Sequence, residues 1–407
     1  MKILHYSDQH LKDSMIEEAR KCLDFIRDTA AKEQVDLIVS AGDWFDSRDV
    51  RLESPSAKLA IEHICEMADI APVAIITGTN SHDGNAPMIL SYARGRFPVI
   101  VADKPMQVLL DGGKFLSQKA RHEYLEAVIT LIPQPTKQFF QTESGIKTAD
   151  QEIGAAMSQI FAGFGAMAAE YDAPHILVYH GGISGARISN GQTLTGQDIE
   201  VSIAQLSLSG ANVHCCGHIH LPQIMPDRTF YAGSIYAKDW GENHVHGFYI
   251  YEIDGQNLLY YFNETPTRKL IRIADDFTIN SPDDIPLNVY LTNLDGSERD
   301  IEGAFVRCDF SCWQDEAGMI DKEMIKQSLM DAGAIDVDIR LVRKPRETVR
   351  SEAVLKVERL RDKLVAMAAL KDETVPESIL EKADLLEGED PEKLIASLLQ
   401  EKVEVAG

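Results

Sequence analysis

Positive charge is scarce in this sequence. Its 407 residues include 40 Lys and Arg against 64 Asp and Glu, so the formal net charge at pH 7 is −24. A protein that binds nucleic acid unaided usually presents a basic surface, and this composition argues against that class. It argues less against an enzyme that contacts DNA through bound metal ions or through a basic partner protein.

Long apolar runs are absent as well. No segment reaches the roughly 18 consecutive apolar residues that a membrane span needs. The opening segment Met1–Asp8 turns polar too early to supply the apolar stretch of a secretory signal. The sequence therefore predicts a cytoplasmic protein that does not associate with membranes.

Cysteine is infrequent. The six cysteines are Cys22, Cys65, Cys215, Cys216, Cys308 and Cys312. Neither the adjacent pair nor the pair separated by three residues has the spacing of a zinc knuckle or a redox motif. We therefore expect reduced thiols, as is usual in a cytoplasmic protein.

The remaining composition is ordinary for a folded protein, with 44% hydrophobic and 26% charged residues. This excludes a mainly disordered or collagen-like chain. At roughly 100–200 residues per domain, the length predicts two or three domains.

Short β-rich runs alternate with amphipathic stretches over the first two-thirds of the chain. We predict strands at 3–6, 35–39, 73–76, 127–132, 176–179, 213–216, 248–253 and 258–262. Ser14 and Glu17 form a capping-box pattern at the start of one helix, and Ser54-Pro55 opens a second. The strand runs are continuously apolar, which indicates strands buried on both faces and thus a layered α/β fold.

The pattern changes near residue 270. A strand at 305–310, a helix at 319–330 and a strand at 337–342 are enough for a small α+β domain. The chain then becomes almost purely helical, with a narrow apolar seam and two shorter amphipathic segments. The apolar residues of this tail are Val357, Leu360, Leu364 and Met367, then Ile379, Leu380, Ala383 and Leu386, then Leu394, Ile395, Leu398 and Leu399.

Such a tail can either pack on its own body or bind a partner. Three short amphipathic segments make a poor independent core, which favours a partner. The predicted domains are accordingly 1–270, 271–345 and a helical tail at 346–407.

Acidic and histidine residues gather directly after predicted strands. In chain order these are Asp8 and His10, Asp43 and Asp46, His82 and Asp83, His180, then His218 and His220. A single histidine at a strand end is more often a satisfied structural residue. Because open α/β sheets collect their sites at the carboxyl ends of strands, the whole set is expected at one edge, and no packing requirement explains it.

This mixture of carboxylates and imidazoles points to metal ions. It suits Mn²⁺, Fe or Zn²⁺. The cysteines are not spaced as the thiolate ligands of a structural zinc site would be, which argues against that kind of site. The set exceeds what one ion needs. A pair of ions about 3.5–4 Å apart that share one carboxylate is the economical interpretation, and such pairs typically hydrolyse phosphate esters.

The motifs resemble those of the calcineurin-like dinuclear metallophosphoesterases, whose signature runs Asp-x-His, Gly-Asp-x-x-Asp, Gly-Asn-His-Asp/Glu, a later His and Gly-His-x-His. Within that superfamily, the opening Lys2–Leu11 and the segments Tyr231–Ile235 and Asp239–Glu242 are similar to the SbcD-type nuclease subunits of double-strand-break repair complexes. The similarity is specific over residues 1–260, and the remainder follows the family only in layout: a DNA-capping domain and then ATPase-binding helices.

The resemblance implies two divalent metal ions, with Mn²⁺ expected and Fe or Zn²⁺ as alternatives. The implied ligands are Asp8, His10 and His220 for the first ion, His180 and His218 for the second, and Asp43 as the bridge. His82 would face the scissile phosphate as a catalytic residue, and Asp83 would orient its ring.

One motif departs from the family. Gly78 and His82 are separated by Thr79, Asn80 and Ser81, which adds two residues to the usual Gly-Asn-His. Asn80 is expected to reach the second ion through a bulged loop. The alternatives are Ser81, or a second site that lacks this ligand.

The resemblance further implies a Mn-dependent DNA exonuclease and endonuclease of 3′-to-5′ type, an SMC-like coiled-coil ATPase bound through 346–407, and a homodimer. One alternative function is a phosphodiesterase or phosphatase for small molecules. The other is a catalytically weak scaffold that docks the ATPase.

Overall fold

The computed structural model describes residues 1–117, 125–135, 149–188, 199–242, 244–278, 291, 299–345, 357–369 and 373–388. The chain divides into two compact units. The first contains Met1–Asp275, Ile285–Asp309 and Asp321–Arg340, and the second contains Asp276–Asp284, Phe310–Ile320 and Leu341–Gly407. The layered body described next belongs to the first unit.

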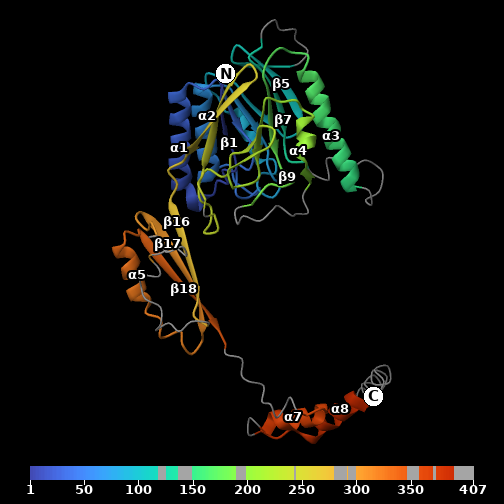
Figure 1. Ribbon diagram of the computed structural model, residues 1–407, viewed down its shortest axis with the longest axis vertical. Coiled ribbons are helices and arrows are strands. Elements are labelled where there is room, and N and C mark those ends of the chain that lie inside the picture. Colours follow the sequence, from blue (N-terminus) through green and yellow to red (C-terminus); the bar gives the residue numbers. More distant parts are fainter. Residues whose placement is uncertain are drawn as a thin grey trace. The chain divides into compact units, whose positions relative to one another are not determined.

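The first sheet has six strands. Their order is β15 (Asn257–Glu264), β14 (Gly247–Asp254), β1 (Lys2–Tyr6), β2 (Leu37–Ser40), β3 (Val73–Ile76) and β4 (Val99–Ala102). Strands β1 to β4 run parallel, and β14 and β15 are antiparallel additions. The helices α1 (Ile16–Glu33) and α2 (Pro55–Ile70) cover one face of this sheet (Figure 1).

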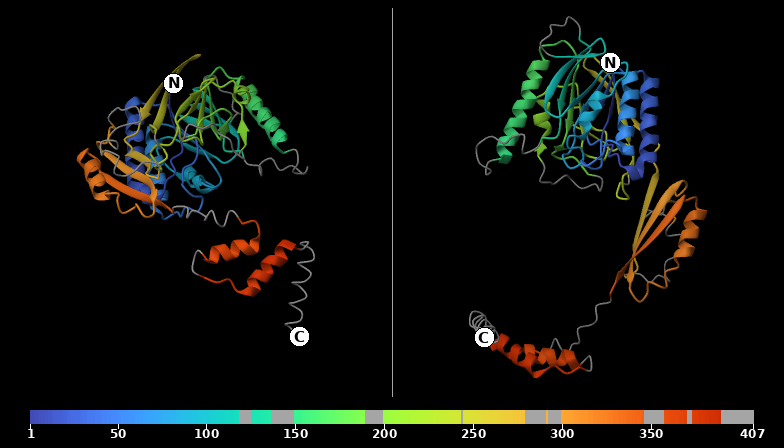
Figure 2. Two further views of the ribbon diagram at one scale, coloured as in Figure 1. Left: turned by 60° about the horizontal axis from the view of Figure 1, so that its bottom comes forward. Right: turned by 180° about the vertical axis from the view of Figure 1, so that it is seen from behind.

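The second sheet has seven strands. Their order is β12 (Gln223–Met225), β13 (Thr229–Tyr231), β11 (Val213–Gly217), β8 (His175–His180), β7 (Ala127–Ile132), β5 (Met106–Asp111) and β6 (Lys114–Leu116). The four strands β13, β11, β8 and β7 are parallel. Helices α3 (Ala149–Ala168) and α4 (Ile203–Ser207) lie on its outer face, opposite α1 and α2 (Figure 2).

Short elements complete this body. They are the 3₁₀ helices η1 (Asp13–Met15) and η2 (Ala86–Tyr92) and the paired strands β9 (Gly182–Ile183) and β10 (Glu200–Val201).

Alternate residues of the parallel strands enter different cores. Ile3 packs between the two sheets with residues of β7, β8 and β11, whereas Leu4 and Tyr6 pack beneath α1 and α2. Both faces of these strands are therefore apolar, which is why the sequence showed continuous apolar runs. The four layers, helix–sheet–sheet–helix, confirm the predicted layered α/β fold.

Two local predictions concern helix starts, and one of them is wrong. Ser54 caps α2, because its hydroxyl accepts a hydrogen bond from Ala57 N at 3.2 Å, and Pro55 is the first helical residue. Ser14, by contrast, lies inside η1, and α1 begins after Met15 with no side-chain cap. The 3₁₀ turn occupies the place that a capping box would need.

The prediction that every strand run is buried on both faces also fails at one strand. In β15, the side chains of Leu259, Tyr260 and Tyr261 are 55%, 46% and 53% exposed. This strand is the edge of its sheet, so its apolar residues have fewer neighbours than those of the central strands.

The carboxyl third contains a three-stranded sheet of β16 (Lys269–Asp276), β17 (Ala304–Trp313) and β18 (Asp336–Lys344), and the helix α5 (Lys322–Asp331). These elements confirm the predicted strands and helix. Strand β16, which was not predicted, begins at Lys269, next to the expected boundary at 270. The division into three domains stays a prediction.

Two helices are described in the tail, α7 (Leu360–Ala369) and α8 (Glu377–Gly388). Arg361 joins them through ion pairs of 2.6 Å to Glu377 and 2.5 Å to Asp384. The third predicted segment, 394–399, lies outside the described residues. None of the helices in the described ranges is long and apolar enough to cross a membrane, and all six cysteines are free thiols.

Candidate metal centre

The loops that follow the parallel strands are tied to one another and locally strained. Asp8 N donates to Gly42 O at 3.0 Å, and His10 N donates to Asp43 O at 2.9 Å. Asp8, His10, Asp43 and His218 have φ angles of 55°, 41°, 55° and 99°. Positive φ is uncommon outside glycine, and such strain concentrates at functional sites. The fold therefore imposes unusual backbone conformations on four of the predicted metal ligands.

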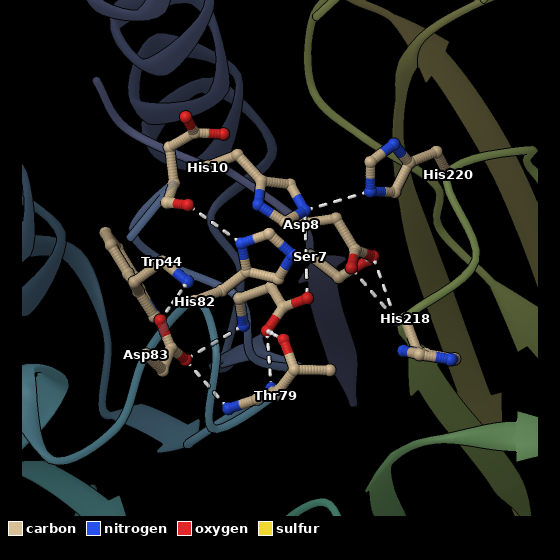
Figure 3. Close-up of polar contacts among 12 residues, drawn as sticks. Ser7, Asp8, His10, Trp44, Thr79, His82, Asp83, His218 and His220 are labelled. Carbon is tan, nitrogen blue, oxygen red and sulfur yellow. Dashed lines mark hydrogen bonds and ion pairs between the residues drawn. The ribbon is translucent and has the colours of Figure 1, made fainter. Parts of the chain in front are cut away.

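One group of donors consists of Asp8, His10 and His220, whose ligand atoms lie within 4.8 Å of one another. His10 Nε2 and His220 Nε2 are 2.9 Å apart (Figure 3). The other ring nitrogen of His220, Nδ1, hydrogen-bonds to the buried carboxylate of Glu242. Because Nδ1–H donates its hydrogen bond to Glu242, Nε2 is left with a lone pair that points into the group, as in metal-binding histidines.

A second group consists of Asp43, His180 and His218. His180 Nδ1 donates to Ala41 O at 2.6 Å, which leaves Nε2 to face Asp43 Oδ2 at 3.4 Å. The same Oδ2 is 3.7 Å from His10 Nε2 of the first group. One carboxylate oxygen of Asp43 therefore lies between the two groups.

The residues present fit two divalent cations. His10 Nδ1 and His180 Nε2 are buried and have no hydrogen-bond partner among the described residues. Glu242 holds His220 Nε2 as an acceptor, and this nitrogen and His10 Nε2, 2.9 Å apart, can share a proton or hold a cation together. Oxygen and imidazole donors without thiolates suit Mn²⁺, Fe or Zn²⁺.

The electrostatics of the second group favour positive charge. Burial opposes ionisation of Asp43, yet the neighbouring His180 holds the pKa of Asp43 well below its usual range. Burial also opposes protonation of His180, but Asp43 and Asp8 raise the pKa of His180 to about 9. The buried carboxylates thus stabilise a cation beside them, which is the environment that a metal ion requires.

The altered loop after β3 places Thr79 against Asp43. Thr79 N and Thr79 Oγ1 both donate to Asp43 Oδ1, at 2.6 and 2.7 Å. Thr79 O in turn accepts from His82 N at 3.1 Å and from Asp83 N at 2.8 Å, which closes a tight turn. Asn80 and Ser81 are exposed at the tip of this turn. Thr79 thus makes the side-chain contact with Asp43, and ligation of the second ion by Asn80 stays a prediction.

His82 reaches the centre as expected, but a different group orients it. His82 Nδ1 hydrogen-bonds to Asp46 O at 2.9 Å, and its ring meets that of His10 edge-on at 4.5 Å between centroids. With Asp46 and His10, it also forms a third group of donors.

The predicted role of Asp83 is wrong. Its carboxylate is fully buried and accepts four backbone N–H groups, from Asp43, Trp44, Phe45 and Gly78, at 3.0, 2.7, 3.1 and 2.7 Å. Burial and the charge of Asp43 raise the pKa of Asp83 to about 7, against the effect of these N–H groups. Asp83 therefore joins the loops after β2 and β3 and is committed to the backbone rather than to the His82 ring.

Sequence reasoning missed two residues of the centre. Thr79 was passed over because the family places an amide there, and Glu242 because it stands 22 residues from His220. Glu242 lies in the segment Asp239–Glu242, which was similar to the nuclease branch but carried no assigned role.

A four-layered α/β body with two adjoining carboxylate–imidazole groups at its strand ends defines a metal-dependent phosphoester hydrolase. The chain belongs to the calcineurin-like phosphoesterase superfamily, whose domain matches residues 1–256.

The chain is similar to one known protein by sequence and to another by structure. The SbcD subunit of the nuclease SbcCD from Staphylococcus epidermidis is 26% identical over 302 residues, which cover 68% of this chain and 73% of that protein. Among solved structures, GAP50, the anchor in the inner membrane complex of Plasmodium, is 14% identical with a TM-score of 0.45, over 65% of this chain and 85% of that one.

Proposed function

We propose that the chain is a Mn-dependent DNA nuclease, an exonuclease and endonuclease of 3′-to-5′ type that serves as the nuclease subunit of a double-strand-break repair complex. The position of Asp43 Oδ2 between two donor groups carries the hydrolytic part of this proposal, because a shared carboxylate is what a two-ion centre needs. The similarity to the SbcD subunit of the nuclease SbcCD from Staphylococcus epidermidis supports DNA as the substrate. With DNA as the substrate, the proposed place of action is the cytoplasm.

Each ligand has a proposed place. Asp8, His10 and His220 would hold the first ion, His180 and His218 the second, and Asp43 both. Bound divalent ions supply charge neutralisation on the phosphodiester and a water of lowered pKa.

The chain's own residues orient these groups. Glu242 and Ala41 O hold His220 and His180 in the tautomers that present Nε2 to the centre. Asp46 O fixes the His82 ring, so that its Nε2 can stabilise the phosphate or protonate the departing oxygen.

The tail is the proposed docking segment for an SMC-like ATPase. Among its described residues, Val365, Met367, Ile379 and Leu386 are 46%, 50%, 46% and 60% exposed. A partner would also provide the basic surface that a chain of net charge −24 lacks. Removal of 346–407 should abolish ATPase binding and leave cleavage of short substrates, and intact binding would refute this docking site. We also propose a homodimer.

The central experiment is a Mn²⁺-dependent nuclease assay on single- and double-stranded DNA, with metal analysis of each protein. Asp43→Ala should lose both bound metal and cleavage, whereas Asp49→Ala, an exposed carboxylate near the same loop, should keep both. His82→Ala should keep its metal and cleave slowly. Full activity of Asp43→Ala would overturn the proposed function, and loss of metal from His82→Ala would make His82 a ligand.

A further inference from the structure

A cavity of about 300 Å³ adjoins the centre at the carboxyl ends of β3, β4 and β7. Gly78 and Asn80, which flank Thr79, form part of its wall. Thr79, the residue between them, hydrogen-bonds to Asp43. The cavity wall is therefore adjacent in sequence to a residue that contacts the proposed bridging ligand. No role in the chemistry described above uses this cavity.

The lining of the cavity combines amides with apolar surface. The residues that line it include Asn80, Asn85 and Gln134, which carry amides, and the apolar residues Pro133, Met157 and Ile160. Gln134 Oε1 is buried and accepts no hydrogen bond from the described residues. Amides both donate and accept, so this lining can match the mixed polar edge of a flat ring.

Charge narrows the class of ligand. The charged residues among those that line the cavity are Asp103 and Lys104, which are both exposed and carry opposite charges. The lining therefore has no net formal charge, which disfavours a second phosphate or a free cation. The cavity is also at the small end of the roughly 300–1,000 Å³ range of ligand sites, too small for a duplex.

We propose that this cavity is a subsite for the nucleobase of a nucleotide that flanks the scissile phosphate. Asn and Gln side chains are among those that pair with base edges, and apolar side chains provide surfaces for the ring faces. The subsite rests on the proposed function, because it needs a nucleotide whose phosphate lies at the metal centre.

The test compares two esters of 4-nitrophenyl phosphate that differ in the base alone, one of thymidine and one of an abasic deoxyriboside. For the wild type, kcat/KM should be about tenfold higher for the thymidine ester, the scale of one base contact. Ile160→Trp, which fills the cavity from α3, should bring this ratio close to one. Met167→Trp is the matched control on the same helix, at an exposed position, and should keep the ratio.

Binding provides a readout that is independent of turnover. Calorimetric titration should show tighter binding of thymidine 5′-monophosphate than of deoxyribose 5-phosphate to the wild type, and equal binding to Ile160→Trp. Asn85→Leu, a change at an exposed position, should reduce the same difference if Ile160→Trp does not fold. Equal binding of the two monophosphates by the wild type would overturn the subsite. Hydrolysis of neither ester, with the binding difference intact, would instead overturn the proposed function and leave a nucleotide site.

Discussion

Thr79→Val tests how the centre orients its shared carboxylate. The substitution keeps the volume of the side chain and the backbone N–H, and removes the hydroxyl that donates to Asp43 Oδ1 at 2.7 Å. With Oδ1 held by Thr79, the oxygen left to face both donor groups is Oδ2. Loss of the hydroxyl leaves the backbone N–H of Thr79 as the remaining Thr79 donor to Oδ1, so the carboxylate is held less firmly and the site that depends most on Asp43 should weaken.

The size of the effect follows from the kind of bond removed. A hydrogen bond to a charged group contributes about 1.5–3 kcal/mol. Each 1.4 kcal/mol corresponds to tenfold in affinity, so the second Mn²⁺ should bind about 10- to 150-fold more weakly to Thr79→Val. The first Mn²⁺, held by Asp8, His10 and His220, should be affected less.

Calorimetric titration of the metal-free protein with Mn²⁺ measures both affinities, and electron paramagnetic resonance distinguishes a coupled pair of ions from a single one. Thr79→Ser retains the hydroxyl and should behave as the wild type. Two ions of unchanged affinity in Thr79→Val, with the coupled spectrum intact, would refute the reasoning, because the Thr79 hydroxyl would then have no influence on Asp43.

Three further predictions concern other positions. Glu242→Gln should weaken the first metal about 10- to 100-fold, since it loosens the tautomer of His220; equal affinity in a competition assay with a chelator would exclude this role. Asp83→Asn should lower the free energy of unfolding by about 3 kcal/mol or more in urea titrations, because an amide cannot accept four N–H bonds as a carboxylate does. Burial lowers the pKa of His175 and His214 to about 4 in the folded state, whereas in the unfolded state it is near the usual value of about 6.5. Below pH 6.5 the unfolded state therefore binds more protons than the folded state. The free energy of unfolding should therefore fall between pH 6.5 and 4, by about 2 kcal/mol per histidine at pH 5, and His214→Gln should show a shallower pH dependence than the wild type.

The layered fold was accessible from the sequence because its central strands are buried on both faces. Such strands leave continuous apolar runs, as in Val73–Ile76 and Ala127–Ile132. The edge strand β15 has a similar composition and is largely exposed. Sequence alone does not distinguish the two cases, because burial of a strand depends on which strands become its neighbours.

The order of the polar residues along the chain was sufficient to predict that Asp8, His10, Asp43, His180, His218 and His220 converge, because the carboxyl ends of parallel strands meet at one edge. The tertiary structure decided the hydrogen bonds among them. Thr79 meets Asp43 across 36 residues of chain, Glu242 meets His220, and Asp83 binds the backbone instead of His82. These partners depend on how the turn after β3 closes and how separate loops pack, and neither leaves a local pattern.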